Sequence, residues 1–135
     1  MRIVSLLHLL IANGYVPVVA CVAGDRRGQV FNVNADQMAV ACAAALGAGQ
    51  LIFLTDVAGI LDENGQLLSE LRAADLRGRL QEGRAVKGGM QVKAQAILRA
   101  LAGGVEAVHV VDGREPHSVV VELFTEKGVG TLVTA

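Results

Sequence analysis

The sequence predicts an α/β fold in which helices cover both faces of a mainly parallel sheet. A short continuous apolar run at 51–54, and a mostly apolar run at 107–111 that contains His109, are typical of strands that are buried on both faces. Segments with helix-forming composition, of which 35–46 and 91–102 are the clearest, alternate with these runs. This alternation implies a three-layer αβα sandwich formed by a single domain over residues 1–135.

Composition limits the classes of function that the chain can perform. The 135 residues are 53% hydrophobic and 19% charged, which describes one compact domain rather than two. The formal net charge is −1 and no basic block is present, so no nucleic-acid partner is predicted. Cys21 and Cys42 stand among apolar neighbours without metal-ligand spacing. They predict small buried thiols of a reducing cytoplasm and no resident metal site.

The N-terminal segment has two interpretations. Met1 and Arg2 followed by the apolar run 3–12 resemble a signal peptide, and 18–21 resembles a lipoprotein cleavage box. Polar interruptions favour instead an amphipathic helix that stops at Asn13-Gly14 and is followed by a strand over 15–22. The apolar face of that helix comprises Ile3, Leu6, Leu7, Leu10 and Ile11. No segment is long enough to span a bilayer, so no membrane partner is predicted.

The stretch 31–38 carries a strand-like alternation directly into an alanine-rich helix. The helix is predicted over 35–46 and ends at Gly47, which can adopt the left-handed conformation. Asp36 lies at its N-terminus, where the helix dipole favours a carboxylate, and Asn32 and Asn34 point to one side of the preceding segment. These three side chains form either a polar ligand site or a capped helix after an asparagine-rich turn.

Thr55 and Asp56 follow the predicted strand 51–54. In open parallel sheets the ligand crevice lies beyond the carboxyl ends of the strands, so this pair marks a candidate nucleotide or sugar site. A simple capped turn is the alternative interpretation. Asn64-Gly65 between two short apolar runs predicts a hairpin, which would form a flap over the crevice.

A basic, glycine-bearing loop at 84–90 precedes the predicted helix 91–102. A surface helix over 71–80, closed by Gly83, is predicted before it. Lys93 falls in the first turn of 91–102, where the dipole disfavours a lysine unless it faces an anion. Lys93 is therefore either a phosphate contact or a solvated lysine of an exposed helix.

The C-terminal part predicts a strand at 107–111, a turn at 112–116, a helix at 117–124 and a last strand at 131–133. His109 lies within the first of these strands. A histidine in an apolar strand is more often a satisfied core residue than a functional one.

Four motifs in the same order resemble those of the amino-acid kinase family. They are NVNAD at 32–36, LTDVAGIL at 54–61, GGMQVK at 88–93 and VHVVDGR at 108–114. The segment ELFTEKGVGT at 122–131 resembles an arginine-inhibited branch of the family. The resemblance implies the family's carbamate kinase-like fold, of which this chain resembles the C-terminal, nucleotide-binding lobe.

The resemblance also implies a reaction and its site. ATP with Mg²⁺ would be a substrate, and its phosphoryl group would pass to the γ-carboxylate of N-acetyl-L-glutamate in arginine biosynthesis. Catalytic roles fall to Lys93, which would stabilise the transferred phosphoryl group, and to Asp36, which would orient catalytic lysines. Asn32 and Asn34 would bind the acetylglutamate. The nucleotide-binding residues would be Thr55, Asp56, Val57, Gly59, Ile60, Leu61, Ala85, Val86, Lys87, Gly88, Gly89 and Met90. L-Arginine would bind as an inhibitor at His109, Glu122 and Gly128.

The sequence also departs from the family pattern. The glycine-rich phosphate loop with a second catalytic lysine, and the arginine that holds the substrate carboxylate, belong to an N-terminal half that this sequence does not contain. A non-catalytic nucleotide- or arginine-binding module is therefore the alternative function, and a kinase of another acidic amino acid is a third. An uncovered apolar helix face predicts a homo-oligomer.

Overall fold

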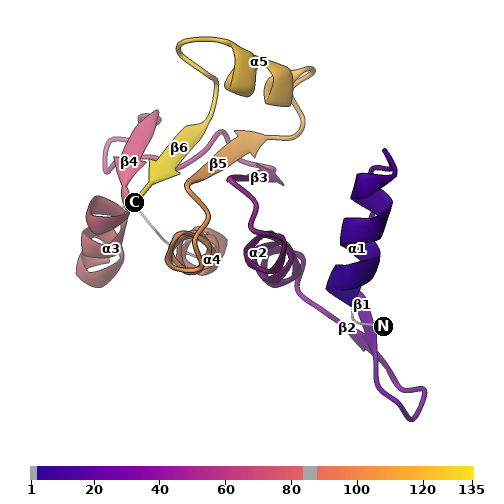
Figure 1. The fold of residues 1–135 in the computed structure, drawn as a ribbon. Helices are drawn as coiled ribbons and strands as arrows, with labels where there is room; N and C mark the ends of the chain where they lie inside the picture. The colour runs from indigo at the N-terminus through magenta and orange to yellow at the C-terminus, as the bar shows by residue number, and fades with distance from the viewer. Residues whose placement is uncertain (1–2, 84–87) are drawn as a thin grey trace.

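The computed structural model describes residues 3–83 and 88–135. Its main sheet has the strand order β3-β5-β6-β4, and a separate antiparallel hairpin is formed by β1 and β2 (Figure 1). In chain order the elements are α1 (Ile3–Ala12), β1 (Val22–Gly24), β2 (Val30–Asn32), α2 (Ala35–Leu46), β3 (Gln50–Thr55), β4 (Glu70–Arg72), α3 (Ala73–Glu82), α4 (Gly89–Ala102), β5 (Ala107–Asp112), α5 (Ser118–Phe124) and β6 (Thr131–Thr134).

The main sheet is mixed but mostly parallel. β3 pairs parallel with β5 and β4 pairs parallel with β6, whereas β5 and β6 are antiparallel. The prediction of a mainly parallel sheet is thus confirmed, with the β5–β6 pair as a correction. Because β6 is the next strand after β5 and lies beside it, the chain can reverse without a crossover to a parallel position.

Helices lie on both faces of the sheet, as the three-layer prediction requires. Figure 1 shows α2, α3 and α4 side by side on one face and α5 on the other. The core lies between the sheet and the three-helix layer, where the most buried side chains include Phe53, Leu76, Ile97, Val108, Val110 and Val133. The buried apolar surface therefore fixes α2 and α4 against β3 and β5, the elements that carry the candidate site.

The helix α2 has the predicted bounds and termini. The Asn34 side chain accepts a hydrogen bond from the backbone N of Gln37, and Gly47 ends the helix with φ 63°. α1 also ends at the predicted Asn13-Gly14, and Gly83 closes α3 in the left-handed region. By contrast α4 begins at Gly89, two residues earlier than expected, so Lys93 lies beyond its first turn rather than within it. The argument from the helix dipole is correspondingly weaker at Lys93.

Two predicted elements are wrong in extent. Of the strand expected over 15–22 only the last residue is in a strand. Residues 15–20 are largely exposed and belong to no strand of the described residues, and Cys21 only accepts a single backbone hydrogen bond from Val33 N at 3.0 Å. The helix expected from Leu71 begins at Ala73 instead. Glu70–Arg72 forms β4, whose parallel pairing with β6 buries Leu71. Pairing with a distant strand here overrides a local helical pattern.

Two burial predictions also need correction. β3 is an edge strand within the described sheet, and Leu54 is 58% exposed rather than buried on both faces. Cys21 and Cys42 are free thiols, but each is only half-buried. Both line an apolar cavity of about 350 Å³ between α1, residues 17–21 and α2.

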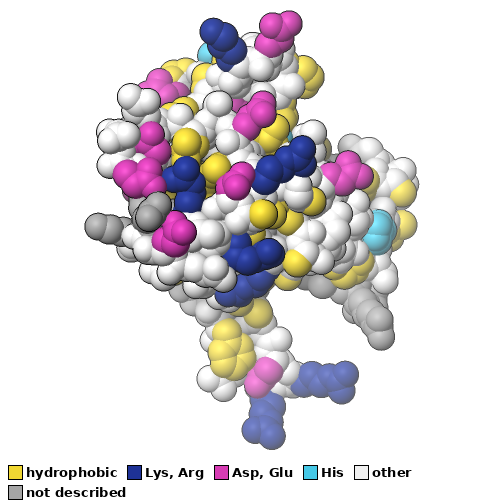
Figure 2. Space-filling model, turned by 90° about the vertical axis from the view of Figure 1, so that its left-hand side faces the viewer, with side chains coloured by type: hydrophobic (Ala, Val, Ile, Leu, Met, Phe, Trp, Pro, Cys, Tyr) yellow, Lys and Arg dark blue, Asp and Glu magenta, His cyan; other side chains and the backbone are white. Residues whose placement is uncertain are grey.

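Within residues 3–83 and 88–135, no helix combines the length and hydropathy that crossing a membrane requires. Acidic and basic side chains are interspersed over the face shown in Figure 2. That distribution agrees with the small net charge of −1.

Candidate functional site

Lys93 and Asp36 meet between two helices. The Lys93 Nζ donates a hydrogen bond of 2.8 Å to Asp36 Oδ2, which joins α4 to the N-terminus of α2. The side chains are 14% and 25% exposed, so the ion pair is partly buried while one edge stays open to solvent. The two residues that the resemblance assigned to catalysis, 57 positions apart, are therefore brought into direct contact. A charge pair with an open edge can receive an anionic ligand without unfolding the core.

The aromatic ring of Phe53 contacts the Lys93 ammonium through its face. Nζ lies 5.0 Å from the centroid of the Phe53 ring, within the ~6 Å range of a cation–π interaction. Phe53 is 4% exposed and belongs to β3. Because side chains alternate along a strand, Thr55 faces the same side of the sheet as Phe53. The Lys93 ammonium therefore lies over a residue that is two positions before Thr55, the last residue of β3.

The two predicted acetylglutamate-binding amides differ in their surroundings. Asn34 is the N-cap of α2, and its Oδ1 accepts from Gln37 N at 3.1 Å. That acceptor is therefore already used, as the capped-helix interpretation expected, and the amide NH₂ group is the part that a ligand could contact. Asn32 is exposed on β2. Both residues lie on the segment that leads into Asp36.

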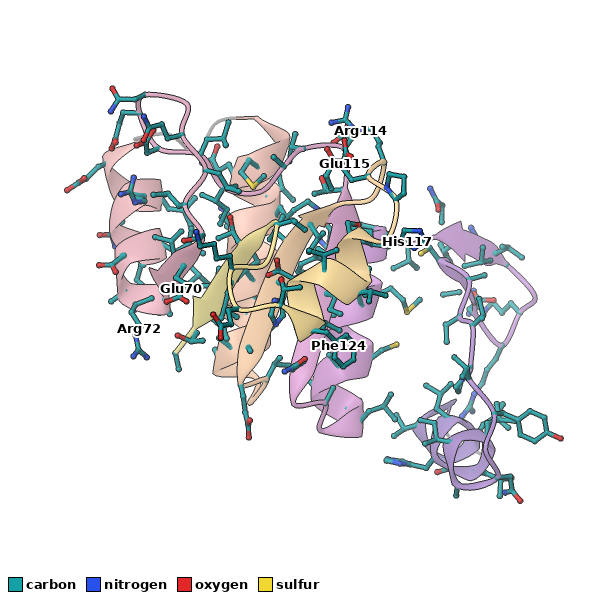
Figure 3. The ribbon with its side chains drawn as sticks, turned by 90° about the horizontal axis from the view of Figure 1, so that it is seen from above. Glu70, Arg72, Arg114, Glu115, His117 and Phe124 are labelled. Atoms are coloured by element: carbon teal, nitrogen blue, oxygen red, sulfur yellow. The ribbon has the colours of Figure 1, made fainter. Side chains whose placement is uncertain are left out.

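The carboxyl ends of β3 and β5 form a polar edge. Thr55 Oγ1 lies 3.4 Å from Asp56 Oδ1, and Gly113 N donates to the backbone oxygen of Thr55 at 2.8 Å. Asp112 accepts from the backbone N and the guanidinium of Arg114, which lowers the pKa of Asp112 to about 2. Asp112, and more weakly Asp56, in turn raise the pKa of Arg114. Figure 3 shows Arg114 and Glu115 at this end of β5, away from Arg72 on β4.

The predicted nucleotide segment 55–61 contains exposed and buried residues. Asp56, Val57 and Leu61 are exposed, whereas Ile60 is fully buried. The Ile60 side chain is thus part of the core, and only its backbone could take part in a site. Gly59 has φ 150° and fits where a side chain would collide with Thr131 and Leu67. The predicted hairpin reduces to a single bridge, Leu61 with Leu67, closed by a turn at Asn64-Gly65.

The second predicted nucleotide segment is described only from Gly88. Ala85, Val86 and Lys87 lie outside the described residues, so their predicted role is untested. Gly88 has φ 58° and precedes α4, while Gly89 and Met90 form its first residues. Apart from chain neighbours and the backbone of α4 itself, no atom of the described residues lies within 4 Å of the position that a Cβ on Gly88 or Gly89 would occupy. The first amides of a helix lack intrahelical acceptors, so this open glycine surface can approach a phosphate.

His109, Glu122 and Gly128, the predicted arginine site, line one cavity of about 520 Å³. Glu122 Oε1 lies 2.9 Å from His109 Nδ1, and Glu122 Oε2 accepts from Val129 N and Gly130 N at 2.8 Å each. Burial alone would raise the pKa of Glu122, but these hydrogen bonds outweigh it and lower the pKa. The carboxylate therefore stays ionised at neutral pH and gives the cavity a fixed negative charge.

The contact with Glu122 also constrains the protonation of His109. An ionised carboxylate only accepts hydrogen bonds, so Nδ1 is the ring nitrogen that carries a proton in this contact. His109 is 6% exposed, and its Nε2 is buried without a hydrogen-bond partner among the described residues. His109 is thus buried, as the core interpretation expected, but it is not satisfied. Glu122 is therefore the group of this pair whose charge is defined on the cavity wall.

Sequence reasoning missed three residues that shape these sites. The sequence places Phe53 in an apolar run, Thr131 at the start of a strand and at the end of the segment 122–131, and Arg114 in a turn and at the end of the motif 108–114, but it assigns none of them an individual role. Phe53 contacts Lys93 and Thr131 contacts Ile60, and both pairs are too far apart in the sequence for a local pattern to relate them. Arg114 contacts Asp112, which is only two residues away. A charged residue two positions after an aspartate in a turn is a signal that could have been used.

Comparison with known proteins identifies the class to which this fold and site belong. The sequence profile of the amino acid kinase family matches residues 2–112, so the chain belongs to this family. Acetylglutamate kinases are among its relatives. The enzyme of Solibacter usitatus is 57% identical over 132 residues, which cover 97% of this chain and 51% of that protein. The chain spans about half the length of the curated relatives that it matches.

Solved structures agree with this assignment. N-acetylglutamate synthase from Neisseria gonorrhoeae, complexed with coenzyme A and N-acetyl-glutamate, matches with a TM-score of 0.92 and 26% identity. The match covers 98% of this chain and 30% of that one. The same synthase complexed with coenzyme A and L-arginine has a TM-score of 0.90 over 96% of this chain and 30% of its own, also at 26% identity. The predicted fold class and the resemblance to the family are thereby confirmed.

Proposed function

We propose that this chain is the nucleotide-binding lobe of an acetylglutamate kinase. In the proposed reaction a γ-carboxylate oxygen of N-acetyl-L-glutamate attacks the γ-phosphorus of ATP. The bond between that phosphorus and the β,γ-bridging oxygen breaks, and ADP leaves with the electron pair. The products are an acyl phosphate and ADP, and Mg²⁺ enters bound to the ATP substrate. Homology to acetylglutamate kinases over nearly the whole chain supports this reaction class.

One observation carries the proposal: the Lys93 ammonium is held at an open edge by Asp36 and by the face of Phe53. Phosphoryl transfer depends on positioning and on neutralising the charge that spreads over the moving group. A fixed ammonium needs no reorganisation when that charge develops. Asp36 keeps the lysine in place, and Phe53 restricts it without competing for its hydrogen bonds.

The other contacts with the nucleotide would come from the segment 55–61 and from the glycine-bearing start of α4. The carboxyl end of β3 and the start of α4 are exposed or half-buried and can face a ligand. The residues at these two places are Thr55 and Asp56, and Gly88 and Gly89. We assign the phosphates to the glycine-bearing start of α4 and the remainder of the nucleotide to 55–61. Acetylglutamate would approach from the Asn32 and Asn34 side of Asp36.

Nucleotide binding by this chain tests the proposal. Calorimetry with ADP and Mg²⁺ should show weak binding, with a Kd on the order of 0.1–1 mM. Gly89→Leu fills the open space at the start of α4 and should abolish that heat without unfolding the chain. Gly49→Leu is the matched control, because a Cβ there also lies more than 4 Å from every described atom outside its chain neighbours. No heat from the folded wild type at millimolar nucleotide would contradict the proposal.

A second function, arginine sensing, is favoured by the cavity at His109 and Glu122. Glu122 supplies a carboxylate for a guanidinium or ammonium group, and His109, which contacts Glu122 at 2.9 Å, lines the same cavity. Of the structures compared above, one synthase complex contains L-arginine. We propose that arginine binds in this cavity and inhibits the kinase.

Glu122→Gln tests this second function. It removes the charge, and the arginine Kd should rise about tenfold or more because a charge-assisted hydrogen bond is worth about 1.5–3 kcal/mol. Glu126→Gln removes a charge from the wall of the same cavity, where Glu126 is exposed, and should change the Kd by less than about threefold. Equal arginine isotherms for wild type and Glu122→Gln would remove Glu122 from the site.

We also propose a homo-oligomer, but not through the helix face on which the prediction rested, because Leu7 is buried and Leu6 and Leu10 are half-buried within the chain. Other large apolar side chains are exposed in the N-terminal part of the chain, including Leu9, Tyr15, Val16, Val18 and Val30. A surface of this kind is stabilised by a covering partner.

A further inference from the structure

Thr131 is a fully buried polar residue at the start of β6, next to both candidate sites. Its Oγ1 accepts a hydrogen bond of 2.9 Å from the backbone N of Ile60, a residue 71 positions away. Ile60 belongs to the predicted nucleotide segment 55–61. One hydroxyl group therefore ties that segment to the sheet.

The packing around this hydrogen bond is close. A Cβ placed on Gly59 would lie 2.6 Å from Thr131 Oγ1 and 3.2 Å from Thr131 N. The backbone at 59–60 is thus in close contact with Thr131, and the segment 55–61 has no alternative position against this part of β6. On the other side, Val129 N and Gly130 N are held by Glu122, so the position of Thr131 is itself fixed.

We propose that Thr131 is a positioning residue for the nucleotide segment 55–61. The inference rests on the proposed function, because it takes this segment to contact the nucleotide. A valine at 131 would fill the same space but leave the buried Ile60 N–H without an acceptor. Since an unpaired buried donor is costly and no other position is open on this part of β6, the backbone at 59–60 would separate from β6 more often and the segment would lose its fit to the ligand.

The experiment compares Thr131→Val with Thr131→Ser, which keeps the hydroxyl group. Thr134→Val is the matched control, because it makes the same change on the same strand at the opposite end. In the full chain we measure the Kd of ADP with Mg²⁺ by calorimetry and the exchange protection of the Ile60 amide by NMR. Thr131→Val should raise the Kd about five- to tenfold and lower Ile60 protection about tenfold or more, whereas Thr131→Ser and Thr134→Val should stay within about twofold.

The outcomes separate this inference from the proposed function. A folded Thr131→Val chain that binds ADP like the wild type and keeps its Ile60 protection overturns the role of Thr131. If the wild type binds no ADP, the proposed function fails, while the Ile60 protection still decides whether Thr131 holds the segment. If Thr131→Val does not fold, Thr131→Ala is compared with Thr131→Ser, and equal Kd values and equal Ile60 protection in that pair overturn the inference.

Discussion

Replacing Gly130 with alanine should cost more than about 3 kcal/mol of the free energy of unfolding. A Cβ at Gly130 would run into the backbone oxygen of Val110 and would lie 3.1 Å from both the Val110 carbonyl carbon and Val111 Cγ2. Val110 lies within β5 and pairs with Thr131, the residue after Gly130. Relief of the clash requires the central β5–β6 pair to separate, so the strain cannot be absorbed by one side chain.

Urea unfolding of the two chains measures this cost, and the midpoint of thermal unfolding should fall by about 10 °C or more. Gly78→Ala is the control, because Gly78 lies inside α3 and a Cβ there meets no atom within 4 Å. That variant should gain about 0.5–1 kcal/mol, since alanine is the better helix former. A Gly130→Ala chain as stable as the wild type would mean that β5 and β6 do not approach as described.

Asp36→Asn should destabilise the chain by about 2 kcal/mol. The substitution keeps the shape of the side chain but leaves the Lys93 ammonium, 14% exposed, without its charged partner. Removing one partner of a fully buried pair typically costs about 3–5 kcal/mol, and the exposed edge of this pair reduces that figure. Part of the attraction to Phe53 remains in the variant, so the lysine should not be expelled completely.

A double-mutant cycle with Lys93→Met isolates the pair, and its coupling energy should exceed about 1 kcal/mol. The more exposed pair of Arg79 and Glu63, whose side chains are 26% and 50% exposed and 3.4 Å apart, provides the control, and Glu63→Gln should cost less than about 0.5 kcal/mol. A coupling energy near zero between Asp36 and Lys93 would show that the pair contributes no more than an ordinary surface contact.

Local patterns were sufficient for much of the fold. The helix over 35–46 and its end at Gly47 follow from alanine content and glycine conformation, both of which act within a few residues. The strands β3 and β5 follow from their continuous apolar runs. Elements whose stability depends on distant partners were less predictable. β4 exists because Glu70–Arg72 pairs with β6, and nothing within those three residues encodes that pairing.

The candidate site depended on the resemblance more than on pattern. From residue types and spacing, phosphate contact is only one of two interpretations of Lys93. That interpretation also places Lys93 in the first turn of its helix, whereas α4 begins at Gly89 and Lys93 lies beyond the first turn. Its contact with Asp36 crosses from α4 to α2 and is a property of the tertiary packing. His109 illustrates the opposite case, because the strand pattern indicated its burial correctly but could not indicate its bond to Glu122 or its unpaired Nε2.

The central claim is that Lys93 contacts the phosphoryl group that is transferred. The most direct measurement compares a non-hydrolysable ATP analogue with ADP, each with Mg²⁺, on the wild type, Lys93→Met and the control Lys127→Met. Lys93→Met should raise the Kd of the ATP analogue about 10- to 30-fold and change the Kd of ADP by less than about threefold, because only the ATP analogue carries a γ-phosphate. Lys127 is exposed on the cavity lined by His109 and Glu122, and its loss should alter neither affinity. Equal effects of Lys93→Met on both nucleotides, or no effect on either, would contradict the assignment.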